Sequence, residues 1–566
     1  MKVVIVGGVA GGATAAARLR RLDETAEIVL FERSGFISYA NCGLPYYIGG
    51  VIEDKAELTL QTPESFARRF GVQVHVRHEV TAIDRAAKTV TVRDLATGRV
   101  FAEPYDKLLL APGAKPTRPA LPGIGLDRLF TLRTVEDTLR IHEFVAAQHP
   151  RSVVLAGGGF IGLELAENLR ERGLEVTIVQ RPAHLMSPFD ADMAALLHRE
   201  VRAHGVRLAL GHSVEGFAET EGGVQVLLQD APPLTADFVV LAIGVTPDSH
   251  LAADAGLDLG VKGSIAVNAR MQPSDPDIYA VGDAVQVRHF VTGQPAVVAL
   301  AGPANKQGRI AADNICGGDS RYRGAQGSSV LKVFDLTAAV TGLSETAARK
   351  AGLDADAVLL SPMDHAGYYP GGAVMTMKVV FARGSGRLLG AQVIGRSGVD
   401  KRIDVLATAL RAGWTAADLT ELDLAYAPPY ASAKDPVNMA GYMIENLLTG
   451  KVRQFRLEDL PALPRDGSVT LLDARTPGEY RAGHADGFAN LPLDDLRGRL
   501  GELDPAKPVY VMCQSGLRSY LACRILTQHG FACYNFAGGY RYYEAVTTDR
   551  RQREQAFACG MDRPGT

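Results

Sequence analysis

Cys42 stands in a run of small and turn-forming residues, from Ser38 to Pro45, that suits a reactive thiol. A free cysteine is only about 3% thiolate at neutral pH, and a helix N-terminus or a cationic neighbour raises that fraction. Gly43 and Pro45 fit a turn that opens a helix. The next cysteine is Cys316, so Cys42 must pair with something other than a neighbouring thiol. We predict that Cys42 does the chemistry; the alternative is a buried structural cysteine.

Cys513 begins a second candidate loop, which ends at Arg518 and leads from a predicted strand into a predicted helix. Such a turn surrounds a thiol with backbone N–H donors and the positive end of a helix, and Arg518 adds charge. These surroundings favour a thiolate and can hold a persulfide anion. A phosphatase-like loop is a less favoured interpretation, because it commonly has one more residue between cysteine and arginine. The other cysteines of this region show no metal-ligand spacing and are interpreted as structural or incidental: Cys523, Cys533 and Cys559.

The segment before Cys42 has the pattern of a βαβ unit, with strands at 2–6 and 27–31, a glycine turn at 7–12 and a helix at 13–22. A dinucleotide-binding turn needs glycine where the chain turns tightly, where it approaches the pyrophosphate and where the helix packs on the strand, and an acid then binds the ribose. Gly7, Gly12 and Glu32 match. Val9 replaces the middle glycine, and Gly8 and Gly11 keep the loop flexible.

A second copy of this pattern follows, with a strand at 152–156, a helix at 163–172 and a strand at 176–179. Gly157, Gly159 and Gly162 supply all three glycines, so the chain is predicted to have two dinucleotide sites. The expected ribose-binding acid is replaced by Gln180, followed by Arg181. Arg181 would pair with a 2′-phosphate or be a solvated charge, and Gln180 still suits a free hydroxyl. The choice between NADH and NADPH stays open.

Two further turns follow predicted strands. One is Ala111-Pro112-Gly113, and the other is Gly282-Asp283, whose acid would meet sugar hydroxyls or cap a helix.

Composition limits the possible partners. The chain has 566 residues, 47% of them hydrophobic, which predicts a globular protein of three or four domains. A net charge of -3 does not favour nucleic acid or an anionic membrane surface. Six irregularly spaced cysteines favour a reducing compartment, and cytoplasm is the expected location. We expect no targeting segment and no membrane span.

Together these motifs resemble the flavin-dependent pyridine nucleotide-disulfide oxidoreductases. The resemblance implies an α/β chain with two Rossmann-like domains: an FAD-binding domain split over residues 1–115 and 246–325, and an NAD(P)-binding domain at 116–245. An α+β dimerisation domain at 326–450 would make a homodimer. The implied FAD residues are Gly7, Gly8, Gly11, Gly12, Glu32, Arg33, Ala111, Pro112, Gly113, Gly282 and Asp283, and the implied NADH or NADPH residues are Gly157, Gly159, Gly162 and Gln180.

The single-cysteine run resembles most closely the coenzyme A-disulfide reductase branch. That resemblance places Ser38 and Asn41 beside the substrate disulfide, and Arg18 and Arg21 at the nucleotide end of coenzyme A. The two arginines lie three residues apart and so share one helix face, which could hold phosphates. The alternative interpretation is a basic face that only contacts solvent. It also implies active-site tyrosines at Tyr368 and Tyr426, supplied across the dimer interface, and a phosphate contact at Lys434.

After a linker at 451–466, the C-terminal part from 467 to 566 resembles an α/β rhodanese domain. The matching residues are Asp473 to Pro477, Gly483-His484 and Cys513 to Ser519, with Cys513 and Arg518 as the implied catalytic pair. No metal site is predicted.

The reductase-like part and the rhodanese-like part stand in one chain, which suggests an enzyme that reduces persulfides. We expect electrons to pass from NADH or NADPH through FAD to Cys42, which attacks coenzyme A persulfide or disulfide and releases hydrogen sulfide or coenzyme A. Cys513 would deliver sulfane sulfur. Alternatives are an NADH oxidase or peroxidase that cycles through a cysteine sulfenic acid, and a redox-sensing sulfur carrier. The main substrate, the sulfur donor and direct exchange between Cys513 and Cys42 stay open.

Overall fold

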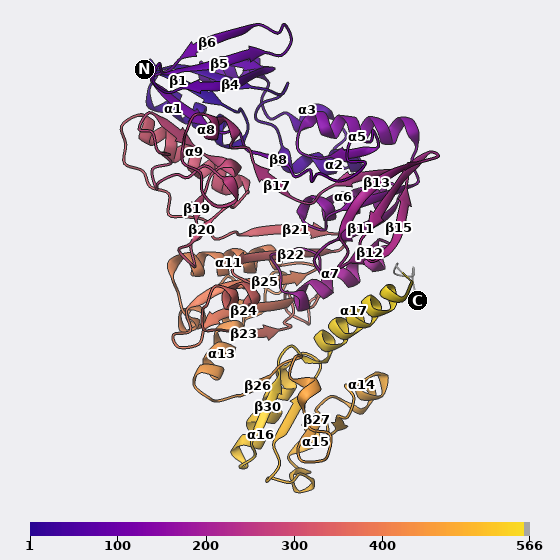
Figure 1. Ribbon diagram of the computed structural model, residues 1–566. Coiled ribbons are helices and arrows are strands. Elements are labelled where there is room, and N and C mark those ends of the chain that lie inside the picture. The colour runs from indigo at the N-terminus through magenta and orange to yellow at the C-terminus, as the bar shows by residue number, and fades with distance from the viewer. Residues whose placement is uncertain (560–566) are drawn as a thin grey trace. The chain divides into compact units, whose positions relative to one another are not determined.

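A computed structural model describes residues 1–559, with side chains as far as Glu554. The chain forms two compact units (Figure 1). The first comprises Met1–Arg181 and Leu208–Gly327, and the second comprises Pro182–Arg207 and the chain from Ser328 onward. Residues 182–207 therefore group with the second unit, although they lie inside the range predicted for NAD(P) binding.

The first unit contains a five-stranded parallel sheet in the order β18-β7-β1-β2-β3. Its strands are β1 (Lys2–Val6), β2 (Glu27–Glu32), β3 (Gln73–Val76), β7 (Lys107–Leu110) and β18 (Ile278–Ala280). A parallel sheet is covered on both faces, which is why the strand Val3 to Val6 is apolar throughout and buried. Helix α1 (Ala10–Leu22) and helix α9 (Ala301–Ile315) approach closely where Gly308 faces the Gly11 carbonyl.

A second sheet is built from the chain between β7 and β18, in the order β12-β11-β10-β16-β9. Its strands are β9 (Leu129–Thr131), β10 (Ser152–Ala156), β11 (Glu175–Gln180), β12 (Arg207–Leu210) and β16 (Phe238–Leu241), with helices α5 (Val135–Gln148) and α6 (Phe160–Glu171). The chain therefore leaves the first sheet after β7, forms the second sheet, and returns to the first at β18. Smaller antiparallel sheets complete the unit: β4 (His78–Asp84), β5 (Thr89–Asp94) and β6 (Val100–Pro104), β13 (Val214–Thr220), β14 (Gly223–Leu228) and β15 (Ala231–Ala236), and β8 (Ala114–Pro116) with β17 (Val245–Pro247).

The second unit begins with an antiparallel sheet in the order β21-β22-β25-β24-β23. The strands are β21 (Ser329–Val333), β22 (Leu336–Gly342), β23 (Ala355–Leu360), β24 (Thr376–Ala382) and β25 (Leu388–Gly395). Its apolar core is shared with helices α11 (Val399–Ala412), α12 (Ala416–Thr420) and α13 (Pro436–Leu448). Helix α7 (Ala191–Ala203), from the segment 182–207, and helix α10 (Glu345–Lys350) also belong to this unit.

A parallel sheet in the order β26-β30-β29-β27-β28 forms the C-terminal part. The strands are β26 (Gln454–Phe455), β27 (Thr470–Asp473), β28 (Ala489–Asn490), β29 (Val509–Met512) and β30 (Cys533–Phe536), and the main helices are α14 (Pro477–Ala482), α16 (Leu517–Gln528) and α17 (Gly539–Cys559). The predicted α/β class with an α+β domain is confirmed. Over residues 1–559, no helix is long and apolar enough to cross a membrane.

Candidate active sites

Cys42 lies where a short helical turn, Asn41–Gly43, runs directly into helix α2 (Leu44–Gly49). Pro45 is in the first turn of α2, so the predicted turn before a helix is confirmed. Cys42 is an exposed free thiol. Ser38, four residues earlier, has a φ of 45°, and its N–H donates to the Gly8 carbonyl at 2.8 Å. The backbone around Cys42 is thereby tied to the first glycine turn.

The protein residues around Cys42 raise the pKa of its thiol, against our expectation of a favoured thiolate. Although the residue is exposed at the surface, neighbouring protein atoms partly desolvate its thiol, and this contributes most. The negative charges of Glu164 and Asp283 add to it, and Arg133 opposes it. Arg133 is the cationic neighbour that the expectation required, but its guanidinium also donates to Asp283 at 2.7 Å. The ion pair with Asp283 therefore weakens the effect of the Arg133 charge on the Cys42 thiol.

Glu164, on helix α6, is a neighbour of Cys42 that the sequence reading missed. Burial, together with the nearby Glu167, raises the pKa of Glu164 to about 7. A carboxyl group that titrates near neutral pH is suited to hold or release a proton beside a thiol. Nothing local in the sequence marks this position, because it depends on how α6 lies beside α2.

The two glycine turns have the same close contacts. A Cβ on Gly12 would lie 1.9 Å from the Gly7 carbonyl oxygen, and one on Gly162 would lie 2.0 Å from that of Gly157. Gly7 and Gly157 have φ of 99° and 116°, which side chains rarely adopt. Around Gly159, by contrast, no atom lies within 4 Å of an added Cβ. That open space leaves room for a ligand to approach the backbone.

The strand ends that follow each turn are also alike. A carboxylate oxygen of Glu32 accepts the Gly8 N–H at 2.9 Å, and the amide oxygen of Gln180 accepts the Gly158 N–H at 2.9 Å. Gln180 thus takes the structural place of Glu32 without its charge. Arg33, expected at the FAD, forms an ion pair with the buried Asp248 at 2.8 Å.

The remaining predicted FAD residues meet at the carboxyl ends of β1, β7 and β18. The Ala111 carbonyl faces Gly7, and Gly113 has a φ of 72°. Asp283 follows β18 in a short helical turn, where Gly282 donates its N–H to Gln307 at 2.7 Å. Ligands of parallel sheets bind at this edge. The residues present fit FAD at the first turn and a nicotinamide dinucleotide at the second.

The helix α1 arginines differ in their surroundings. The Arg18 guanidinium donates to Asp313 of α9 at 2.8 Å, whereas Arg21 is exposed in the last turn. The pairing with Asp313 reduces the charge that Arg18 offers to a phosphate.

Tyr368 and Tyr426 are brought together in the second unit. Their hydroxyl oxygens lie 2.7 Å apart, and the side chains are exposed. The predicted phosphate contact, Lys434, is also exposed.

Cys513 is buried at the end of β29, where its Sγ accepts hydrogen bonds from the Gly516 N–H and the Ser519 hydroxyl, both at 3.2 Å. The sulfur thus receives one backbone N–H and one hydroxyl, where the sequence predicted backbone N–H donors. Arg518, however, donates an N–H from each terminal nitrogen to the carboxylate of Glu479 on α14, at 2.7 and 2.8 Å. In this structure Arg518 therefore joins α14 to the Cys513 loop through an ion pair. Ser519 belongs to the segment that resembles a rhodanese domain but was given no role of its own, and Glu479 was not singled out.

A cavity of about 820 Å³ opens beside this loop. Its walls include the loop residues Gln514 to Arg518, the apolar side chains of Met439 and Met443 on α13, and the cations Lys434 and Arg541. The lining is mainly apolar with cations among it, which suits an elongated ligand that carries negative charge. Lys434 thus shares a cavity with the Cys513 loop.

Cys523 and Cys533 are buried in the same core as Cys513, as expected for structural thiols. The Cys533 thiol donates to the Cys523 carbonyl at 3.1 Å. Cys559 lies outside the residues whose side chains are described.

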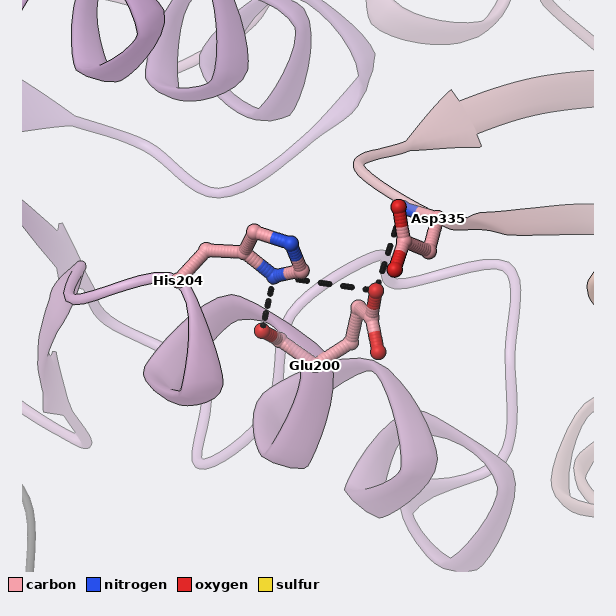
Figure 2. Close-up of side chains that lie close together, drawn as sticks. All are labelled: Glu200, His204 and Asp335. Carbon is pink, nitrogen blue, oxygen red and sulfur yellow. Dashed lines mark hydrogen bonds and ion pairs between the residues drawn. The ribbon is translucent and has the colours of Figure 1, made fainter.

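One group that the sequence reading did not single out could hold a metal ion: Glu200, His204 and Asp335, whose ligand atoms lie within 4.8 Å of one another (Figure 2). Its members are already tied by other contacts. Asp335 donates its N–H to Glu200 at 3.1 Å, and its carboxylate pairs with Arg396 at 3.3 Å. The His204 Nδ1 lies 3.0 Å from the Glu200 carbonyl oxygen, and its ring stacks on Phe334. These contacts fix the end of α7 to the β21–β22 turn.

Three family models match consecutive parts of the chain. Residues 1–308 match the pyridine nucleotide-disulphide oxidoreductases, residues 328–436 the dimerisation domain of those proteins, and residues 457–545 the rhodanese-like domain. The chain belongs to the pyridine nucleotide-disulphide oxidoreductase family and carries a C-terminal rhodanese-like domain.

Individual relatives agree with this assignment. The chain is 37% identical to the coenzyme A disulfide reductase of Staphylococcus aureus strain JH9 over 442 residues, 78% of this chain and 99% of that protein. The reduced Bacillus anthracis CoADR-RHD structure has a TM-score of 0.95 and 47% identity, covering 97% of this chain and 98% of its own. The structure of an NAD-dependent persulfide reductase from A. fulgidus has a TM-score of 0.90 and 36% identity, covering 96% of this chain and 100% of its own.

Proposed function

We propose that this protein is a flavin-dependent NAD(P)H reductase of coenzyme A persulfide and coenzyme A disulfide, to which the rhodanese-like domain delivers sulfane sulfur. The observation that carries the proposal is the presence of two unlike thiols: an exposed Cys42 beside the first glycine turn, and a buried Cys513 in a cradle of donors. One suits attack on an external disulfide, and the other suits transient storage of a persulfide.

The reductive step uses Cys42. Its thiolate attacks the inner sulfur of coenzyme A persulfide, so that the Cys42–coenzyme A disulfide forms and hydrosulfide leaves. With coenzyme A disulfide, the leaving group is one coenzyme A thiolate. FAD and NAD(P)H, when bound, supply the two electrons that return the mixed disulfide to the Cys42 thiolate and free coenzyme A.

Several residues prepare this step. Glu164, with a pKa of about 7, accepts or returns a proton near Cys42. Ser38 and Asn41 border the thiol on its own loop, and Arg18 and Arg21 bind the coenzyme A phosphates. The tyrosine pair Tyr368 and Tyr426, contributed by the second subunit of a homodimer, donates one hydrogen bond to the leaving thiolate, from the hydroxyl that accepts within the pair.

Cys513 supplies the persulfide substrate. A polysulfide or another persulfide enters the cavity beside the loop, and the Cys513 thiolate attacks its outer sulfur. One S–S bond breaks, the Cys513 persulfide forms, and the donor leaves as a thiolate or as a polysulfide one sulfur shorter. The Gly516 N–H and the Ser519 hydroxyl stabilise the anion. Transfer of that sulfur to coenzyme A thiolate regenerates Cys513.

The test is anaerobic sulfide release from coenzyme A persulfide, counted against NADH or NADPH consumed. We expect one sulfide per reduced nucleotide in the wild type and in Cys513→Ser, and none in Cys42→Ser with FAD still bound. Turnover by Cys42→Ser would refute the proposal. Nucleotide oxidation that requires oxygen or peroxide would favour the oxidase or peroxidase alternative, in which the exposed Cys42 cycles through a sulfenic acid.

A further inference from the structure

Two arginine side chains contact the Cys513 loop, and the first is neutralised inside the domain. Arg475 donates from Nε and from one terminal nitrogen to the carboxylate of Asp473, at 3.0 and 2.7 Å. Its other terminal nitrogen donates to the side chain of Gln514 in the loop, at 3.2 Å. Arg475 and Asp473 are 2% and 0% exposed, so their charges compensate each other out of reach of a substrate.

The second arginine, Arg518, lines the cavity beside Cys513, but Glu479 holds both of its terminal nitrogens. Glu479 is itself fixed in place. Its carboxylate accepts from the N–H and the hydroxyl of Thr476, at 3.0 and 2.9 Å, in the capping box that begins α14. The carboxylate is therefore already oriented toward Arg518, and it neutralises the guanidinium that would otherwise bind an anion in the cavity.

The groups that remain at the sulfur suit a single negative charge. Sγ of Cys513 accepts from the Gly516 N–H and the Ser519 hydroxyl, both at 3.2 Å, just before the N-terminus of α16. Uncharged donors and a helix end stabilise a thiolate or the terminal sulfur of a persulfide. Apolar side chains, among them Met439 and Met443, make up most of the cavity wall and suit the carbon skeleton of an organic donor.

Sulfur donors differ in the charge of the group that leaves. When the Cys513 thiolate attacks the outer sulfur of an organic persulfide, the S–S bond breaks, the Cys513 persulfide forms and a singly charged thiolate leaves. When it attacks the outer sulfur of thiosulfate, the S–S bond breaks and doubly charged sulfite leaves. Sulfite concentrates its charge on a few oxygens, so its departure needs a cation close by. Arg518 is the charged residue of the loop, and it is occupied.

We infer that Glu479 is a positioning residue that sets the donor specificity of Cys513: by pairing with Arg518, it makes the site select organic persulfides over thiosulfate. The inference rests on the proposed storage of sulfane sulfur at Cys513, and it names the class of donor that this site takes. Glu479 acts by keeping a cation from the donor and does not touch the donor itself.

The test compares the full-length wild type with Glu479→Gln, with the double variant Glu479→Gln/Arg518→Met, and with the control Glu502→Gln. The control breaks a pair with Arg499 elsewhere in the same domain. Formation of thiocyanate from cyanide is measured with thiosulfate and with glutathione persulfide as donors, and the rate of Cys513→Ser is subtracted. The quantity compared is the ratio of kcat/KM for thiosulfate to kcat/KM for glutathione persulfide, which does not depend on the fraction of protein that is folded.

We expect a wild-type ratio below about one tenth, raised by about tenfold or more in Glu479→Gln because the released guanidinium stabilises the leaving sulfite. The double variant should return to the wild-type ratio, and Glu502→Gln should keep it. A wild type that uses both donors equally, or an unchanged ratio in Glu479→Gln, would overturn the inference.

An equal rise in the double variant would also overturn it, because a loosened loop and not the charge of Arg518 would then admit thiosulfate. If the wild type formed thiocyanate from neither donor beyond the rate of Cys513→Ser, the proposed role of Cys513 in sulfur transfer would fail instead.

Discussion

The hydroxyl oxygens of Tyr368 and Tyr426 lie 2.7 Å apart although 58 residues separate them in the chain. The hydrogen bond from Tyr426 raises the pKa of Tyr368 above that of a free phenol. Both side chains are exposed, with 76% and 47% of their surface accessible, so burial does not explain why two phenols meet. A hydroxyl that stays protonated in such a pair is suited to donate a hydrogen bond to a leaving thiolate.

We predict that Tyr368→Phe and Tyr426→Phe each lower kcat for reduction of coenzyme A persulfide by about tenfold to a hundredfold. Because the two hydroxyls act through one hydrogen bond, the double variant should be little worse than either single one. Anaerobic flavin reduction by NADH should be unchanged. Tyr430→Phe, another exposed tyrosine, is the control, and additive losses in the double variant would contradict a shared role.

Two glycines of the second turn allow effects on folding and effects on ligand binding to be measured separately, because only one of them is packed against protein atoms. Gly162→Ala places a Cβ 2.0 Å from the Gly157 carbonyl oxygen and should destabilise the fold. Gly159→Ala meets no protein atom within 4 Å, and its φ of -87° is allowed for alanine. We therefore predict a wild-type melting temperature for Gly159→Ala but weaker binding of the reduced nucleotide, measured by the dependence of flavin reduction on NADH or NADPH, whichever the wild type uses. Wild-type affinity for that nucleotide in this variant would show that no phosphate approaches there.

Much of this architecture was predictable because its requirements are local. A glycine turn between a strand and a helix is encoded within about a dozen residues, and so is the strand, turn and helix around Cys513. The partners of the charged side chains were not predictable. Arg518 pairs with Glu479 and Arg33 with Asp248, since such pairs depend on which distant segments converge. The grouping of residues 182–207 with the second unit has the same origin: its anchors, Lys378 and Asp549, lie far along the chain.

Glu164 should control the ionisation of Cys42. Its carboxylate raises the pKa of the Cys42 thiol, so Glu164→Gln should lower that pKa and speed alkylation of Cys42 by iodoacetamide at pH 8. Below pH 7, where Glu164 is increasingly protonated in the wild type, the two proteins should converge. Glu171→Gln, on the same helix but exposed, is the control. Equal alkylation rates at pH 8 would show that Glu164 does not act on the thiol.

The same carboxyl group predicts a dependence of stability on pH. The pKa of Glu164 is raised from 4.5 to about 7 on folding, so the folded state binds the proton more tightly. The ionised form is thus disfavoured in the folded protein, and stability falls as the pH rises from about 4.5 to 7. Glu164→Gln should therefore raise the melting temperature above pH 7 and change it little below pH 4.5.

The Arg518–Glu479 pair gives a prediction of opposite sign. The hydrogen bonds from Arg518 contribute most to lowering the pKa of Glu479 from 4.5 to about 2, and burial opposes them. Glu479 also accepts the Thr476 N–H at 3.0 Å, so its carboxylate caps α14 while it holds the Cys513 loop. Because its pKa is depressed on folding, its contribution to stability is complete well above pH 4.5 and is lost as the pH falls toward 2.

Glu479→Gln keeps the size of the side chain and removes its charge. It should lower the melting temperature of the full chain at pH 7, and the difference from the wild type should shrink steadily below pH 4.5. Glu502→Gln, which breaks the more exposed pair with Arg499 at 2.7 Å in the same domain, should have little effect at any pH, because solvent screens an exposed ion pair. A difference between Glu479→Gln and the wild type that stays constant down to pH 3 would mean that lost packing, and not the lost ion pair, destabilises the variant.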